Sequence, residues 1–219
     1  GGGLRPYILY AKSFESMDQF NLWTFGIGWD RPVNEEVKGW DLSIEIAGQT
    51  GDGYDSATGV SDGLDFGGYI FEGWFGWGFG DAGRVHIGYF LASGDDNPLD
   101  DSNDAWQPLF PDPHANNRLG NLDLFAGFGN IVDPTGAGMS NVQDISLGYD
   151  WWGSDNHAMI AFHSLSRVEV ASGANDDIGI ELDLAYERQY AENASFVVGI
   201  STLFAGDYLN DRVGGANDD

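Results

Sequence analysis

The sequence predicts an all-β fold, an antiparallel meander that forms part of a transmembrane β-barrel, and three observations support this. Apolar and polar residues alternate with period two through most of the chain, and no long window keeps the i, i+3, i+4, i+7 apolar spacing of a helix. The connections between alternating segments are mostly long and short by turns, as in membrane barrels with short turns on one rim and long loops on the other. No run approaches 18 consecutive apolar residues, so a membrane could be crossed only by strands of about 9–11 residues.

Each expected strand shows this two-faced pattern. In 178–190, for example, Ile180, Leu182 and Leu184 alternate with Glu181 and Asp183. In 40–48, 66–79 and 141–152, aliphatic and aromatic residues likewise alternate with acidic residues, serine and glycine. We expect about nine strands, over residues 4–13, 22–30, 40–48, 66–79, 84–93, 141–152, 158–170, 178–190 and 195–206.

The connections divide into two sets. Mostly long ones cover 14–21, 49–65, 94–140, 171–177 and 207–219, and mostly short ones cover 31–39, 80–83, 153–157 and 191–194. We therefore expect residues 1–219 to form a single barrel region in which 94–140 is a long external loop. Bacterial single-chain barrels have an even number of strands, so an odd count predicts an incomplete barrel with a closing strand after Asp219.

Composition restricts the function classes. The chain carries 35 Asp and Glu against 9 Lys and Arg, a formal net charge of -26, which argues against a nucleic-acid partner because phosphate binding needs clustered cations. Its 14% aromatic content, with 8 Trp, is unlike a disordered acidic tail. The absence of Cys excludes disulfides and thiolate metal sites. The first residues contain no export signal, so we expect such a signal to lie outside this chain.

The acidic residues fall into two groups. One occupies strand positions opposite the apolar face, and we expect these residues to line the lumen: Asp41, Glu45, Glu72, Asp144, Asp150, Glu181, Asp183 and Glu187. The other lies in the long loops. There we consider Ca²⁺, which prefers six to eight oxygen ligands, as a candidate ligand of Asp52, Asp55, Asp95, Asp96, Asp100 and Asp101, although no EF-hand spacing is present and simple surface solvation is the alternative. No other cofactor is expected.

Other motifs give no signal for an enzyme. Gly78 to Gly83 satisfies G-x-G-x-x-G but precedes a strand instead of opening a helix, which favours a tight glycine turn over a dinucleotide site. The histidines, His86, His114, His157 and His163, lack metal-ligand spacing. No G-x-S-x-G elbow or distinct pair of carboxylates is present, and we expect the protein not to be an enzyme.

Three segments resemble a known family. Residues 91–96 read Leu-Ala-Ser-Gly-Asp-Asp, and Trp106-Gln107-Pro108-Leu109-Phe110-Pro111, His114, Leu119-Gly120 and Asp123 follow. With Ile178 to Leu184 and Gly199 to Asp207, they resemble in order and spacing the alginate-export family of bacterial outer-membrane porins. The resemblance implies a monomeric barrel of eighteen strands, of which this chain would be the C-terminal half without its last strand.

The resemblance also implies a polyuronate substrate drawn in by an Arg- and Lys-rich lumen, whereas the expected inner face here is acidic and would repel polyanions. We therefore expect a porin of the bacterial outer membrane for passive diffusion of ions, preferentially cations, or small solutes. Its expected partners are outer-membrane lipid, those solutes and a protein in the lumen or at the rim. The alternative is a structural barrel or a soluble acidic β-sandwich that binds a protein, Ca²⁺ or carbohydrate.

Overall fold

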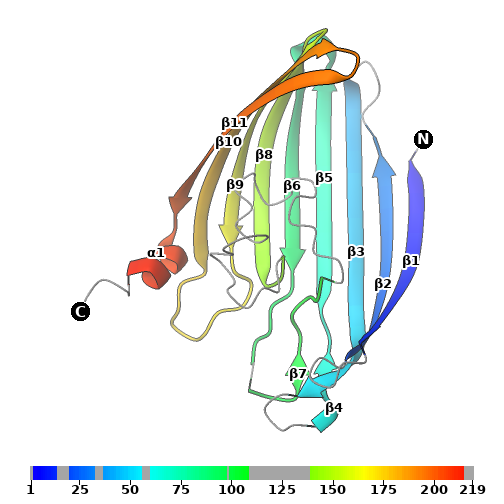
Figure 1. The fold of residues 1–219 in the computed structure, drawn as a ribbon, viewed down its shortest axis with the longest axis vertical. Helices are drawn as coiled ribbons and strands as arrows, with labels where there is room; N and C mark the ends of the chain where they lie inside the picture. The colour runs from blue at the N-terminus through cyan, green and yellow to red at the C-terminus, as the bar shows by residue number, and fades with distance from the viewer. Residues whose placement is uncertain are drawn as a thin grey trace.

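The structure is a computed structural model that describes residues 2–13, 20–32, 37–55, 60–97, 99–108 and 139–214. It is nearly all β (Figure 1). The strands are β1 Gly3–Ser13, β2 Phe20–Arg31, β3 Lys38–Asp55, β4 Val60–Phe66, β5 Tyr69–Phe79, β6 Arg84–Ala92, β7 Ser102–Asn103, β8 Val142–Trp152, β9 Asn156–Ser166, β10 Asp177–Ala191 and β11 Ala194–Ala205, with the 3-10 turn η1 Gly80–Ala82 and the helix α1 Asp207–Gly214.

The strands form one curved sheet in the order β1-β2-β3-β5-β6-β8-β9-β10-β11, with every neighbour along this path antiparallel. β4 pairs with β3, and β7 adds to β4 in parallel. Within the described residues β1 and β11 are the edges, so the sheet is an open part of a barrel (Figure 1). A sandwich needs two packed sheets, which this single sheet does not provide. No described helix has the length and apolarity needed to cross a membrane.

The nine strands of this path correspond to the nine predicted ones. Two of the predicted connections contain elements that were not predicted. β3 continues through Asp55 and β4 returns beside it, within the segment 49–65 that we expected to be a loop. Helix α1 occupies 207–214, which we also expected to be irregular. Residues 51–55 contain two glycines and two aspartates with Tyr54, which leaves no continuous apolar face to signal a strand. An eight-residue helix is too short to show a clear 3.6-residue period.

From β5 onward the connections alternate between short and long as predicted. We call the end with β2–β3, β5–β6, β8–β9 and β10–β11 connections the turn end, and the opposite end, with 93–141 and 167–176, the loop end (Figure 1). At the turn end, Gly80 and Gly83 have φ of 73° and 92°, and the Gly83 N–H donates to the Gly80 carbonyl at 2.8 Å. This confirms a tight glycine turn for the G-x-G-x-x-G segment, because both backbone conformations are ones that favour glycine.

The outer face of the sheet, the one that carries Phe25, Phe75 and Ile145, is apolar and exposed. Its exposed large side chains include Leu4, Ile8, Ile27, Ile46, Trp77, Ile87, Leu147, Phe162, Ile180, Ile200 and Phe204. On β5, an 11-residue strand, outward side chains run from Tyr69 to Phe79. At a rise of about 3.3 Å per residue and a tilt of about 40°, this strand spans about 25 Å, the height of the lipid-facing band of an outer-membrane barrel.

The inner face, which carries Glu72, Asp144 and His163, is largely polar but has an apolar patch near the loop end. This inner apolar patch consists of Ala47, Ile70, Phe90, Ala92, Val142, Leu165 and Ile178. Leu209 of α1 is buried against it, and Trp106, Met139 and Tyr208 pack on it as partly buried side chains. Connections at the loop end therefore fold inward over the wall and bury apolar surface there.

Candidate functional site

The eight carboxylates predicted to line the lumen all lie on the inner face. Strand register fixes this, because residues directly opposite in neighbouring antiparallel strands point to the same side. Asp41, Gly76, His86, Gly148, Ala161 and Asp183 form one such row across six strands. Asp41, Glu72, Asp144, Asp150, Glu181 and Asp183 are buried, whereas Glu45 and Glu187 are half-buried. Their role as pore-lining residues remains a prediction.

At the turn end, Arg84 connects two of these carboxylates. Its Nη2 and Nε donate to the two oxygens of Asp41 at 2.6 and 2.8 Å, and its Nη1 donates to Asp150 at 3.1 Å. Gly76 lies between the strands that carry Asp41 and Arg84, and a Cβ there would overlap both side chains. A glycine at this position therefore lets the bidentate ion pair cross β5.

Two histidines join the same network. Nδ1 of His86 lies 3.1 Å from Asp150 Oδ2 and 3.0 Å from Arg84 Nη1, and Nε2 of His157 lies 3.1 Å from Asp150 Oδ1. We call Asp41, Arg84, His86, Asp150 and His157 the turn-end network. Contrary to the predicted connection 153–157, His157 belongs to β9, where its ring stacks on Trp152 at 4.9 Å.

A second polar cluster lies on the inner face, between the turn-end network and the inner apolar patch. Nδ1 of His163 is 2.7 Å from Asp144 Oδ2, and its Nε2 is 3.8 Å from Asp183 Oδ2. Glu181 is directly opposite His163 in the β9–β10 ladder and is fully buried. Asp144 Oδ1 and Ser146 Oγ are buried without a hydrogen-bond partner. Buried polar atoms of this kind are costly, so the cluster is a functional candidate instead of a stabilising core.

Glu45 and Glu72 lie directly opposite each other, an arrangement that costs energy for like charges unless other groups offset it. Aromatic donors reach both carboxylates. The Tyr7 hydroxyl donates to Glu45 at 2.7 Å, and the Trp74 indole N–H donates to Glu72 at 3.0 Å. Another inward arginine, Arg5, pairs with Asp30 at 3.0 Å. Arg5 and Arg84 are therefore each matched with carboxylates.

The described part of the long connection is held against the inner face at the loop end. Gln49 Nε2 donates to the carbonyl of Gln107 at 2.7 Å, while the Gln107 N–H donates to Gln49 Oε1 at 2.8 Å. Ser93 Oγ donates to the carbonyl of Asp104 at 2.7 Å. The side-chain amide of Gln49 thus substitutes for a neighbouring strand and fixes the connection beside β3.

The predicted calcium loops are only partly described, since the side chain of Asp55 lies outside the described residues. Among the described residues no group of three or more acidic or histidine side chains could hold a metal ion. Hydrogen bonds from the N–H and hydroxyl of Ser102, each 2.9 Å, and from Asn97 lower the pKa of Asp100. Desolvation raises the pKa of Asp95. Asp100 thus organises its own turn, and Ca²⁺ binding stays a prediction.

Several site residues were not predicted from the sequence. Arg84 gave no signal of its own, and the convergence of His86 and His157 on Asp150 depends on strand register. His114 and the segment 109–123 of the family resemblance lie outside the described residues. The one sequence signal for Arg84 and the histidines is their place in the alternation of inward and outward residues, which could have assigned them to the inner face.

A comparison with protein families gives a match between residues 18–219 and the family described as alginate export. The chain belongs to the alginate export family. The match covers nearly the whole chain, including β2 to β11, and agrees with the resemblance drawn from the three segments. No curated protein matches the chain. Membership accounts for the antiparallel meander and indicates a protein of channel-mediated transport.

Proposed function

We propose that this chain forms part of the wall of a bacterial outer-membrane channel through which cations and small neutral solutes diffuse passively, without a catalytic role. The observation that carries the proposal is the charge of the inner face. Described carboxylates outnumber arginines there, and Arg5 and Arg84 are each paired with aspartates. A negatively charged wall concentrates cations and repels polyanions such as a polyuronate, because a narrow aqueous pore focuses the electrostatic field.

The exposed apolar outer face supports the membrane placement. Its height of about 25 Å fits the hydrocarbon layer of an outer membrane, and contiguous apolar surface of this extent is rare on soluble monomers. Long connections at one end and short turns at the other support an orientation in which the loop end faces the cell exterior.

Conductance in planar bilayers under reversed salt gradients tests the proposal. We expect a reversal potential of the sign given by cation preference, and clear anion selectivity would contradict it. Replacing the half-buried acids in the double variant Glu45→Gln and Glu187→Gln should reduce the preference, because both side chains belong to the inner face. As a control, Asp81→Asn removes one charge from an exposed turn and should leave selectivity unchanged.

A further inference from the structure

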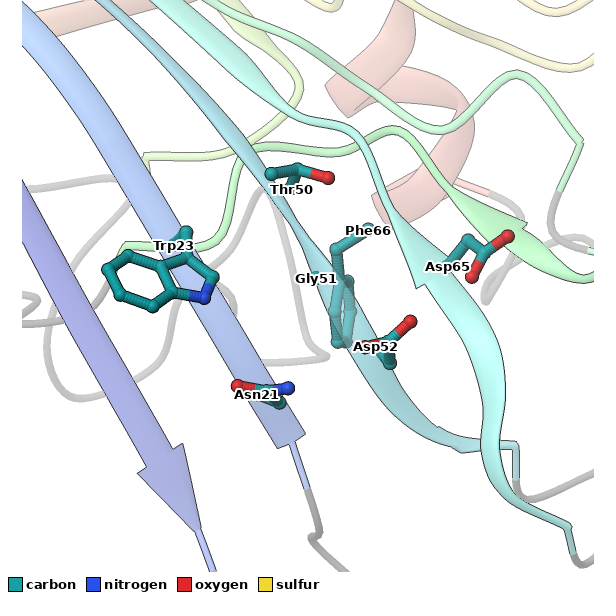
Figure 2. A pocket seen from close by; sticks show the side chains of 7 residues that line it. All are labelled: Asn21, Trp23, Thr50, Gly51, Asp52, Asp65 and Phe66. Carbon is teal, nitrogen blue, oxygen red and sulfur yellow. The ribbon is translucent and has the colours of Figure 1, made fainter.

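A pocket lies at the loop end of the sheet, between β2, β3 and β4 (Figure 2). It encloses about 430 Å³ and is lined by Asn21 and Trp23 of β2, Thr50 and Asp52 of β3, and Asp65 and Phe66 of β4. None of these residues belongs to the acidic inner wall described above. The polar lining of the pocket is therefore separate from the inward carboxylates.

Strand register places the polar lining on the outer face. Asn21, Asp52 and Asp65 form one row, and Trp23 and Thr50 form the next. Trp23 shares its side of β2 with the exposed Phe25 and Ile27. The pocket thus lies where the apolar band ends and polar rows begin, the position at which Trp is enriched in membrane proteins.

The chemistry of the lining selects a class of ligand. Asp52 and Asp65 are directly opposite each other, and no described side chain bonds to either carboxylate. Asn21 Oδ1 is buried without a hydrogen-bond partner. The lining therefore offers two carboxylate acceptors beside an indole that is 41% exposed. A ligand that presents several donors and an apolar face, such as a sugar ring, matches this set, whereas a phosphate or uronate would be repelled.

We propose that this pocket binds uncharged or amine-bearing core sugars, beyond the lipid A disaccharide, of a glycolipid in the outer leaflet. Its place on the lipid-facing side, immediately beyond the apolar band at the loop end, puts it at the depth of headgroups. The aromatic ring would stack on a sugar face while the two carboxylates accept hydrogen bonds from hydroxyl or ammonium groups. This inference rests on the proposed outer-membrane placement but not on the ion selectivity of the channel.

Native mass spectrometry of the detergent-purified full chain tests the pocket, with a lipopolysaccharide that carries lipid A and core sugars as the probe. Trp23→Leu should weaken binding about tenfold, because it removes one aromatic contact and leaves an apolar side chain. Trp77→Leu is the matched control, since Trp77 is also outward and is 47% exposed, but lies near the turn end. It should bind like the unaltered protein.

Two further arms identify the ligand. Lipid A without core sugars should bind more weakly than the full glycolipid, and free core oligosaccharide should bind with the same dependence on Trp23. Equal effects of the two Trp variants, or equal binding of lipid A alone, would overturn the proposal. Loss of all binding on chelation of divalent cations would also overturn it, since bridging by a cation would then replace direct hydrogen bonds to Asp52 and Asp65. Because binding is measured without conductance, an anion-selective channel with an intact pocket would contradict only the proposed function.

Discussion

The inner face is built differently at its two ends. At the turn end it carries the turn-end network, in which Arg84 is held between two buried aspartates. At the loop end it carries the inner apolar patch, with Trp106 and Leu209 packed against it. Period-two alternation continues through both ends, so alternation alone does not determine whether a wall position is polar. The difference follows from what lies against the wall, because apolar side chains are stable on this face only where another segment covers them.

The largest effect is expected from breaking the turn-end network. Arg84→Met leaves Asp41 and Asp150 as buried carboxylates without their main cation, which should lower the free energy of unfolding by about 3–5 kcal/mol. Denaturant unfolding in detergent micelles, followed by intrinsic fluorescence, measures this change.

Arg5→Met provides the matched control for that experiment. Its ion pair with Asp30 has the same chemistry, but the Arg5 side chain is 65% exposed, so its loss should cost less than about 1 kcal/mol. Equal destabilisation by the two variants would mean that burial does not distinguish the turn end from the exposed edge of the sheet.

An intermediate effect is expected where the long connection is held at the loop end. Gln49→Leu removes both hydrogen bonds to Gln107 and should destabilise the packing of 99–108 against the inner face by about 1–3 kcal/mol. Faster hydrogen exchange in peptides covering 99–108, read by mass spectrometry, is the expected result. Thr24→Val, which removes only the 3.2 Å contact to Gln49, should change exchange much less. An unchanged rate in Gln49→Leu would show that apolar contacts alone hold this segment.

The smallest effect is expected in the external acidic turn. The pKa of Asp100 is lowered by hydrogen bonds from Ser102, so ionised Asp100 stabilises the turn above its usual pKa and this contribution is lost as pH falls through the lowered value. Asp100→Asn should therefore speed exchange of the Ser102 amide at neutral pH. In strongly acidic solution the variant and the unaltered protein should become alike. A difference that persists there would assign the effect to side-chain geometry instead of charge.

Much of the fold could be predicted because alternation is a local property. Ile180, Leu182 and Leu184 opposite Glu181 and Asp183 are sufficient to define a strand and its two faces. The same parity placed all eight predicted carboxylates on the inner face. β4 could not be predicted, because its partner segment at 51–55 is mostly glycine and aspartate and has no continuous apolar face.

The candidate site could not be predicted in full, because it depends on contacts between segments that are far apart in the sequence. His86 and His157 meet at Asp150 only because of the register of β6, β8 and β9, which no local pattern encodes. The need for glycine at position 76 also depends on the ion pair that crosses it. Similarly, nothing near Leu209 in the sequence indicates that it is buried against the inner wall.

The alternation of apolar and polar residues in every long strand has a consequence for how such a chain reaches its destination. A protein bound for the outer membrane must first be carried across the inner membrane, where segments of about 19 apolar residues are retained as helices. Because half of each strand is polar, the mean hydropathy of this chain is only -0.26. The apolar surface is assembled only when the strands pair, so the unfolded chain can pass through the first membrane without being held there.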